Sequence, residues 1–382
     1  MKRRIAIIGA SYLQLPLVRK AQEMGLEVHC FAWQDGAVCQ TVADRFYPIS
    51  ITEKEEILRV CRQVGVHAVT TIASDLAVPT VNYVAAQLGL TGNDDRYSAM
   101  VTNKLLMRRA FAEHGVPSPA FALVRVTDEG VVASDLAQAE ALPLPVIVKP
   151  TDRSGSRGVE RVTERRRLEG AIARAAAESF GRETIVEEYV EGSEVSVESI
   201  SWQGRHHVLQ ITDKVTTGAP HFVELEHHQP SLLPPGIQAD IRTLVPHVLD
   251  ALHIAYGASH TEIKITPDGR LFVVETGARM GGDFIGSDLV ALSTGYDYLR
   301  GVIEVALGTF SEPVTGEHHY AGVYFLSAET AWLKPIIANA VKGTDGVVAA
   351  EMTSNELRQT ESSADRSGYL IYQNDNGRLQ LR

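Results

Sequence analysis

Over the first hundred residues, short apolar runs alternate with segments in which apolar residues recur at helical spacing. Short apolar runs typical of buried strands occur at 3–10, 27–33 and 66–73. Apolar residues recur at helical spacing in the segments 15–25, 52–65 and 78–89, and the second of these opens with the capping-box pattern of Thr52 and Glu55. Strands separated by helices of this length predict a parallel, doubly wound sheet.

The pattern changes after residue 100. A helix is expected from 101 and ends at Gly115, and from 145 onward strand-like runs with hairpin spacing dominate. The tail from 311 is mixed and ends in a hairpin predicted on Asn376-Gly377. We therefore expect four units: an N-terminal domain, a smaller strand-rich unit with its connecting helix, a larger catalytic unit, and a C-terminal αβ segment packed on that unit. Their expected ranges are 1–100, 101–190, 191–310 and 311–382.

Composition narrows the possible partners. The 382 residues carry a formal net charge of −11, so no broad basic field is present to attract nucleic acid or a membrane surface. The three cysteines lie within the first 61 residues without metal-site spacing, which is typical of reduced thiols in a cytoplasmic protein. The apolar run at 5–10 is too short to cross a membrane and lacks a cleavage site after it.

The segment 145–162, PVIVKPTDRSGSRGVERV, combines a strand, a Gly/Ser loop and a second strand. Small residues leave backbone N–H groups free to point toward an anion. Lys149 precedes the glycines, and a strand follows them, so the element differs from a Walker A loop. We interpret it as a β-hairpin whose tip folds over a triphosphate; a plain surface hairpin is the alternative.

A second chemical pattern lies at 258–286. The turn TPDG separates two strand-like runs, and a four-residue loop at 267–270 would set Glu262 opposite Glu275. The same register would pair Ile263 with Val274 and Ile265 with Phe272 on the other face.

Two directly opposed carboxylates repel each other unless a cation lies between them. Hard oxygen ligands suit Mg²⁺ held together with nucleotide phosphates, and a solvated pair on an exposed face is the alternative. The segment TGARMGG follows at once and brings Arg279 beside the carboxylates, where transferred phosphoryl charge needs a partner.

A third pattern, TIVEEYVEGSEVSVESI at 184–200, places acidic residues around the bend at 191–193. Backbone groups there could meet an adenine edge, and Glu194 could accept ribose hydroxyls. Acidic turns are common, so this pattern gains weight only from its place in the series.

Taken in order, these motifs resemble the ATP-grasp superfamily over residues 1–310. The resemblance implies a doubly wound parallel-sheet domain (α/β), a lid subdomain of antiparallel strands, and a larger C-terminal α+β domain. It implies that ATP is bound with Mg²⁺ or Mn²⁺, and it assigns roles to individual positions. The phosphate ligands would be Lys104 and Lys149, the lid Ser154, Gly155, Ser156 and Gly158, the adenine pocket Glu187, Glu188 and Val190, the ribose ligand Glu194, the metal ligands Glu262 and Glu275, and the acyl-phosphate ligand Arg279.

One position departs from the superfamily pattern, and three segments resemble one of its branches. Many members carry Asn two residues after the second metal glutamate, where this chain has Gly277, and that leaves the number of metal ions open. The segments HTEIK and ETGARMGGD, with the histidine pair His227-His228, resemble the L-amino-acid ligase branch. Lys264 shares the strand face of Glu262 and could meet ATP phosphates or a substrate carboxylate.

The resemblance implies an ATP-dependent, ADP-forming ligase that activates a carboxylate as an acyl phosphate and couples it to an amine, such as an amino acid. Its partners would be small molecules, and a homodimer is the commonest assembly for such a chain. Two alternatives stay open: a purine-biosynthesis or carboxylase type that activates formate or bicarbonate, and a non-catalytic nucleotide-binding regulator.

Overall fold

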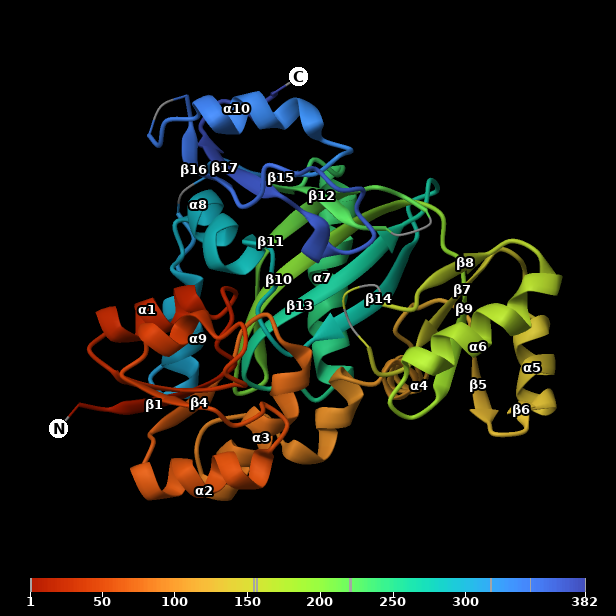
Figure 1. The fold of residues 1–382 in the computed structure, drawn as a ribbon, viewed down its shortest axis with the longest axis horizontal. Helices are drawn as coiled ribbons and strands as arrows, with labels where there is room; N and C mark the ends of the chain where they lie inside the picture. Colours follow the sequence, from red (N-terminus) through yellow and green to blue (C-terminus); the bar gives the residue numbers. More distant parts are fainter. Residues whose placement is uncertain are drawn as a thin grey trace.

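Three lobes make up the computed structural model (Figure 1), which describes residues 2–153, 155, 157–219, 222–316, 318–343 and 345–381. Residues of all three lobes line a pocket between them, which we call the hollow. The N-terminal lobe and the smaller lobe built from residues 121–188 flank a long, curved sheet, and the C-terminal strands lie at the far end of that sheet. None of the helices in the described part combines the length and apolar character that a bilayer crossing requires.

The N-terminal lobe is the expected parallel sheet, in the order β3-β2-β1-β4. Its core is aliphatic and includes Ile5, Ile7 and Val28, which are fully buried. The third strand in sequence, a three-residue run with little apolar pattern, was not expected. The capping-box prediction was wrong, because the helix begins one residue later and no side chain caps it. The elements are β1 (Arg4–Ile8), α1 (Leu15–Glu23), β2 (Glu27–Phe31), β3 (Arg45–Tyr47), α2 (Lys54–Val64), β4 (Ala68–Thr70) and α3 (Val78–Leu88).

The small lobe is an antiparallel sheet in the order β6-β5-β9-β7-β8, and the helix α4 (Lys104–His114) connects it to the N-terminal lobe. The helix α6 packs its alanine-rich face on this sheet. The expected Gly/Ser hairpin is the connection between β7 and β8. The elements of this lobe are β5 (Phe121–Thr127), β6 (Gly130–Val131), α5 (Ala133–Glu140), β7 (Val146–Pro150), β8 (Glu160–Val162), α6 (Leu168–Glu178) and β9 (Glu183–Glu188).

The long sheet has the order β14-β13-β10-β11-β12-β15-β17-β16, so residues 311–382 continue the same sheet instead of forming a separate layer. The predicted terminal hairpin was wrong: its first arm is β17, but the residues after Asn376 form no strand, and Leu379 is held through its carbonyl by Tyr324. The strands are β10 (Ser193–Trp202), β11 (Arg205–Thr216), β12 (Glu224–Gln229), β13 (Gly257–Ile265), β14 (Leu271–Gly277), β15 (Tyr320–Leu326), β16 (Val347–Met352) and β17 (Gly368–Asn374); the helices are α7 (Pro235–Ala251), α8 (Val290–Thr294), α9 (Tyr298–Ala306) and α10 (Lys334–Asn339).

The strands β10 and β13 have one apolar and one polar face at the end that meets the hollow. Val195, Val197 and Ile263 pack on the apolar side of α7. Because side chains alternate along a strand, their neighbours Glu194 and Glu262 point to the opposite face. The sheet therefore presents a row of charged side chains to the hollow.

The pairing of β13 with β14 differs from the predicted register in an informative way. Glu262 does lie opposite Glu275, but the flanking pairs are Ile263 with Val273 and Ile265 with Leu271. The predicted pairs with Val274 and Phe272 were wrong, because the turn is one residue shorter: Thr266 donates its N–H to the carbonyl of Arg270, and an irregularity beside Glu262 restores the offset.

The apolar face against α7 should dominate the stability of the long sheet. Ile211 on β11 is fully buried, whereas Val215 on the same strand is 41% exposed. We expect Ile211→Ala to lower the free energy of unfolding by about 2–5 kcal/mol and Val215→Ala by less than about 0.5 kcal/mol. Urea unfolding followed by circular dichroism measures both losses. Equal losses would contradict the conclusion that burial against α7 dominates the stability of the sheet.

Candidate active site

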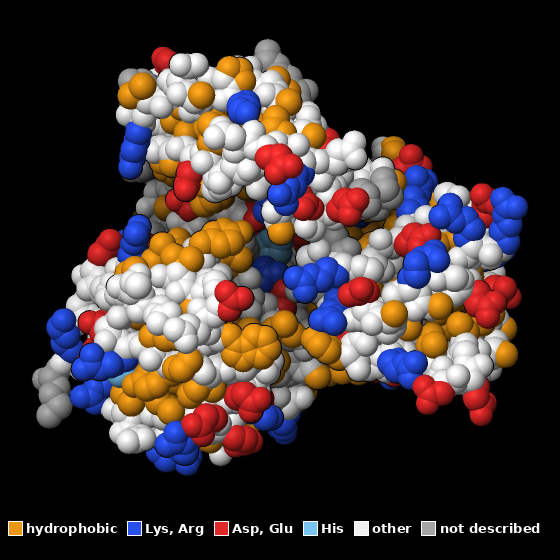
Figure 2. All heavy atoms as spheres, viewed as in Figure 1, with side chains coloured by type: hydrophobic (Ala, Val, Ile, Leu, Met, Phe, Trp, Pro, Cys, Tyr) orange, Lys and Arg blue, Asp and Glu red, His pale blue; other side chains and the backbone are white. Residues whose placement is uncertain are grey.

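A pocket opens where the three lobes meet, and blue basic side chains crowd its mouth (Figure 2). Its floor is the polar face of β10, β11 and β13, and the small lobe forms the opposite wall. Most of the residues singled out in the sequence line it: Lys104, Lys149, Gly155, Glu187, Glu188, Val190, Glu194, Glu262, Lys264, Glu275 and Arg279.

Three of the four predicted lid residues are not found among the described residues that line the pocket. Gly158 does not line the pocket; its backbone has a φ of 68°, and a Cβ there would lie 3.0 Å from Pro150. Ser154 and Ser156 lie outside the described residues, so their lid role stays a prediction. The roles of the other residues also stay predictions, although their positions are now clear.

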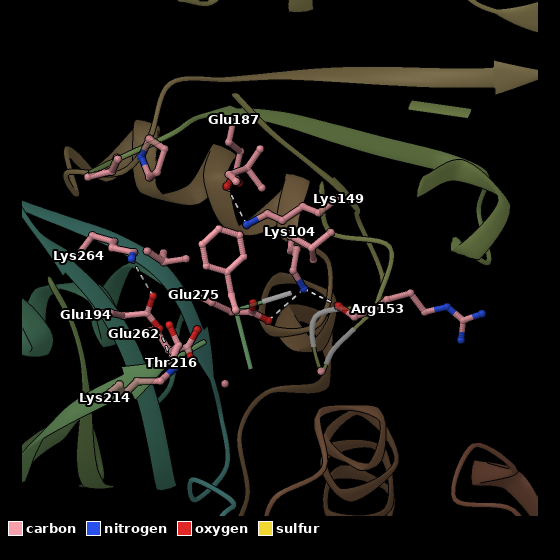
Figure 3. Close-up of a pocket in the computed structure, with 18 of the residues that line it drawn as sticks. Lys104, Lys149, Arg153, Glu187, Glu194, Lys214, Thr216, Glu262, Lys264 and Glu275 are labelled. Atoms are coloured by element: carbon pink, nitrogen blue, oxygen red, sulfur yellow. Dashed lines mark hydrogen bonds and ion pairs between the residues drawn. The ribbon is translucent and has the colours of Figure 1, made fainter. Parts of the chain in front are cut away.

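The opposed glutamates each contact a lysine. Lys104 Nζ lies 3.1 Å from Glu275 Oε1, and Lys214 Nζ lies 2.7 Å from Glu262 Oε1 (Figure 3). Within the described ranges no group of three His, Cys, Asp or Glu side chains could hold a metal ion alone. Two opposed carboxylates offer the hard oxygen donors that suit a divalent ion whose other ligands come from a nucleotide and water.

Lys214 is a pocket side chain that the sequence analysis missed. It comes from β11 and touches Glu194 at 2.7 Å and Glu224 at 3.5 Å, in addition to Glu262. Burial would lower the pKa of Lys214, but these three carboxylates outweigh it and hold the pKa well above the ordinary lysine value. No local motif marks Lys214; the pairing of β11 with β10 and β12, and of β10 with β13, brings it beside the acidic residues.

Lys149 and Glu187 form a buried pair in the wall of the small lobe. Lys149 Nζ lies 2.7 Å from one oxygen of Glu187, and Arg108 Nε lies 2.9 Å from the other. Burial would raise the pKa of Glu187, but Arg108 and Lys149 hold it below the ordinary value. The carboxylate therefore lies between two cations, one of which is the pocket residue Lys149.

The acidic bend at 191–193 leads directly to the pocket. Glu194 accepts from Lys214 and lies 3.2 Å from Lys264, so the predicted ribose ligand is bracketed by two lysines. Gly192 closes the bend against β13, because a Cβ there would lie 2.0 Å from the carbonyl oxygen of Ile265.

Arg279 is bound by Asp75, a residue of the N-terminal lobe. Its Nε and Nη2 donate to the two oxygens of Asp75 at 2.8 Å and 3.0 Å. Both side chains are 16% exposed and line the pocket.

A second buried pair lies beside it. His260 Nδ1 lies 2.5 Å from the fully buried Glu198, and His260 Nε2 lies 3.6 Å from Glu262. Burial would lower the pKa of His260, but Glu198 raises it to about 9. The floor of the pocket thus alternates negative and positive groups from Asp75 to Lys264.

The Glu187 cluster should make stability depend on pH. Its pKa is lower in the folded chain than in the unfolded chain, so the carboxylate contributes stability above pH 4.5, and this contribution is lost as the pH falls through the folded value. We expect Glu187→Gln to lower the free energy of unfolding at pH 7 by about 3–5 kcal/mol, because Arg108 and Lys149 are left unpaired.

Urea unfolding at pH 7 and pH 4 tests this expectation, with the exposed Glu140→Gln as the matched control. The native chain and the control should lose stability between the two pH values, and the Glu187→Gln variant should lose less. The same loss in all three chains would contradict the assignment.

Comparisons with known proteins agree with this geometry. Residues 142–288 match the family profile described as an ATP-grasp domain. The chain is 26% identical over 252 residues to a D-alanine–D-alanine ligase of Cupriavidus necator, covering 63% of this chain and 74% of that protein. It is 27% identical over 250 residues to the alanine–anticapsin ligase of Bacillus subtilis; this match covers 60% of the chain but only 51% of that relative's length.

Solved structures match almost the whole chain. The L-amino acid ligase from Bacillus licheniformis superposes with a TM-score of 0.78 at 23% identity, covering 98% of this chain and 94% of that one. The phosphoribosylglycinamide synthetase from Anaerococcus prevotii gives 0.76 at 19% identity, covering 98% and 95%. At these identities the likeness establishes the fold. Residues 142–288 thus match an ATP-grasp domain, within a fold that agrees with ATP-dependent ligases of known structure over almost the whole chain.

Proposed function

We propose that the protein is an ATP- and Mg²⁺-dependent ligase that activates a carboxylate as an acyl phosphate and couples it to the amine of an amino acid. The observation that carries the proposal is the opposed pair Glu262 and Glu275 on the floor of a pocket that also contains Lys104, Lys149 and Lys214. Opposed carboxylates among several lysines suit the phosphates of a nucleotide and their metal ion.

The nucleotide would lie between the small lobe and the long sheet. Its adenine would meet the apolar side chains Ile147, Val190 and Val274 and the backbone near Glu188, all of which line the pocket. Its ribose would meet Glu194, and its phosphates would meet Lys104, Lys149 and Lys214 and the backbone at Gly155. Mg²⁺ held by Glu262 and Glu275 would neutralise phosphate charge.

The proposed reaction requires that the substrates be positioned and that the charge of the phosphates be neutralised. A carboxylate oxygen of the substrate attacks the γ-phosphorus of ATP, the bond to the bridging oxygen breaks, and ADP leaves. An amine then attacks the acyl carbon, loses a proton, and displaces inorganic phosphate to form an amide. Arg279 would stabilise the charge on the transferred phosphoryl group, and the lysines would steady the leaving nucleotide.

An amino acid is favoured as the amine by two kinds of support. The acidic side chain of Glu224 lines the same pocket and suits a substrate ammonium group. In addition, the curated relatives in the same superfamily are named as ligases of alanine or D-alanine.

We expect phosphate release when the purified protein receives Mg²⁺, ATP and a pair of amino acids. Release should be small when ATP or the amino acids are omitted. Hydroxylamine in place of the amine should trap the activated acid as a hydroxamate. Mass spectrometry of the trapped product separates amino-acid activation from activation of formate or bicarbonate. Phosphate release that requires bicarbonate or formate would contradict the amino-acid proposal, and binding of ATP with no turnover would favour a regulator.

Glu275→Gln removes one of the two opposed carboxylates and should lower kcat for ADP release by roughly 100-fold or more, the order expected for a preorganised electrostatic group. The exposed Glu113→Gln serves as the matched charge control and should keep native turnover. A coupled assay for ADP measures both variants; unchanged turnover in Glu275→Gln would exclude the metal role.

A further inference from the structure

We propose that Asp75, supplied by the N-terminal lobe, is a positioning residue for Arg279, and that its carboxylate fills the space of the side chain absent at Gly277. The proposal rests on the proposed function, because it concerns how Arg279 is aimed at the transferred phosphoryl group. It also gives a physical reason for the glycine that departs from the superfamily pattern.

The first step is steric. A Cβ built on Gly277 would lie 2.7 Å from Asp75 Oδ1 and 3.1 Å from Arg279 Nε. Gly277 lies in β14 and is absent from the glycines with positive φ, so its backbone would accept any residue. The two neighbouring side chains, and not the backbone, therefore exclude a side chain at this position.

The second step is geometric. Asp75 opens a short turn, Asp75–Ala77, at the end of the N-terminal sheet, and Arg279 lies in the loop after β14. The amide N–H of Ala73 donates to the carbonyl oxygen of Met280 at 3.1 Å, so the two loops run beside each other. The paired carboxylate and guanidinium consequently join two lobes at the pocket wall.

The third step concerns the donors that remain on Arg279. A guanidinium has five N–H groups in a rigid plane. The Nε donor and one Nη2 donor go to Asp75, and Nη1 makes a long contact of 3.4 Å with the carbonyl of Met280. Asp75 thus binds one edge of the guanidinium plane and fixes its orientation. The remaining N–H donors of Arg279 are left to bind an anion.

The kinetic test compares Asp75→Asn, Arg279→Lys and the double variant. We expect Asp75→Asn to lower kcat roughly 100-fold, the order of a misplaced reactive group, while KM for ATP stays within a factor of about two. The double variant should be no slower than Arg279→Lys alone, because Asp75 acts only through Arg279. Additive losses, or a native kcat in Asp75→Asn, would overturn the proposal.

A matched control is Asp297→Asn. Asp297 also forms an ion pair that joins the N-terminal lobe to a helix of another part of the chain, at 2.9 Å from Lys20, but it does not line the pocket. We expect native kcat in this variant. A loss as large as that of Asp75→Asn would mean that any weakened contact with the N-terminal lobe slows the reaction, and the specific role would fail.

A second measurement does not depend on turnover. Gly277→Ala should lower Tm in the native chain, because the new methyl displaces the Asp75 carboxylate, and should not lower it in the Asp75→Gly chain. Equal shifts in both chains would overturn the shared-space argument. If the native protein shows no ligase turnover, the proposed function fails, and this unfolding cycle decides separately whether Asp75 and position 277 compete for one space.

Discussion

Compensation of buried charge is the constraint on which the site depends. Lys214 is almost fully buried, and it can stay ionised there only because Glu194, Glu262 and Glu224 surround it. Removing any one charge from such a cluster leaves the others poorly solvated, whereas exchanging one partner for another keeps the balance. The proposed nucleotide and metal ion would bring both signs of charge and would therefore enter by exchanging partners with the lysines and glutamates already present.

This balance follows from how the long sheet is built. One face of β10 and β13 is covered by α7, so its alternate residues must be apolar. The other face meets the hollow and collects ionisable residues from several strands. The two small units then close the hollow from opposite sides: Lys149 comes from the small lobe and Asp75 from the N-terminal lobe. Asp75 pairs with Arg279 beside the floor, whereas Lys149 pairs with Glu187 inside the small lobe.

The sequence revealed what is local and missed what depends on pairing between distant segments. The parallel sheet, the hairpin of the small lobe and the opposition of Glu262 to Glu275 follow from short periodic patterns. The neighbouring pairs were wrong, because loop length and a β-bulge compensate each other and leave no separate mark in the pattern. Lys214 and Asp75 could not be found this way: an isolated lysine or aspartate looks the same whether it faces water or a pocket.

The continuity of the long sheet through β12, β15, β17 and β16 has a further consequence for the integrity of the chain. β12, which carries the histidine pair, uses its outer backbone groups to bond β15. Without the last three strands, those groups would become an open edge next to the pocket and would recruit any extended segment that came near. The C-terminal segment, which offers no chemical motif of its own, therefore covers the backbone edge beside the pocket and moves the open edge of the long sheet out to β16.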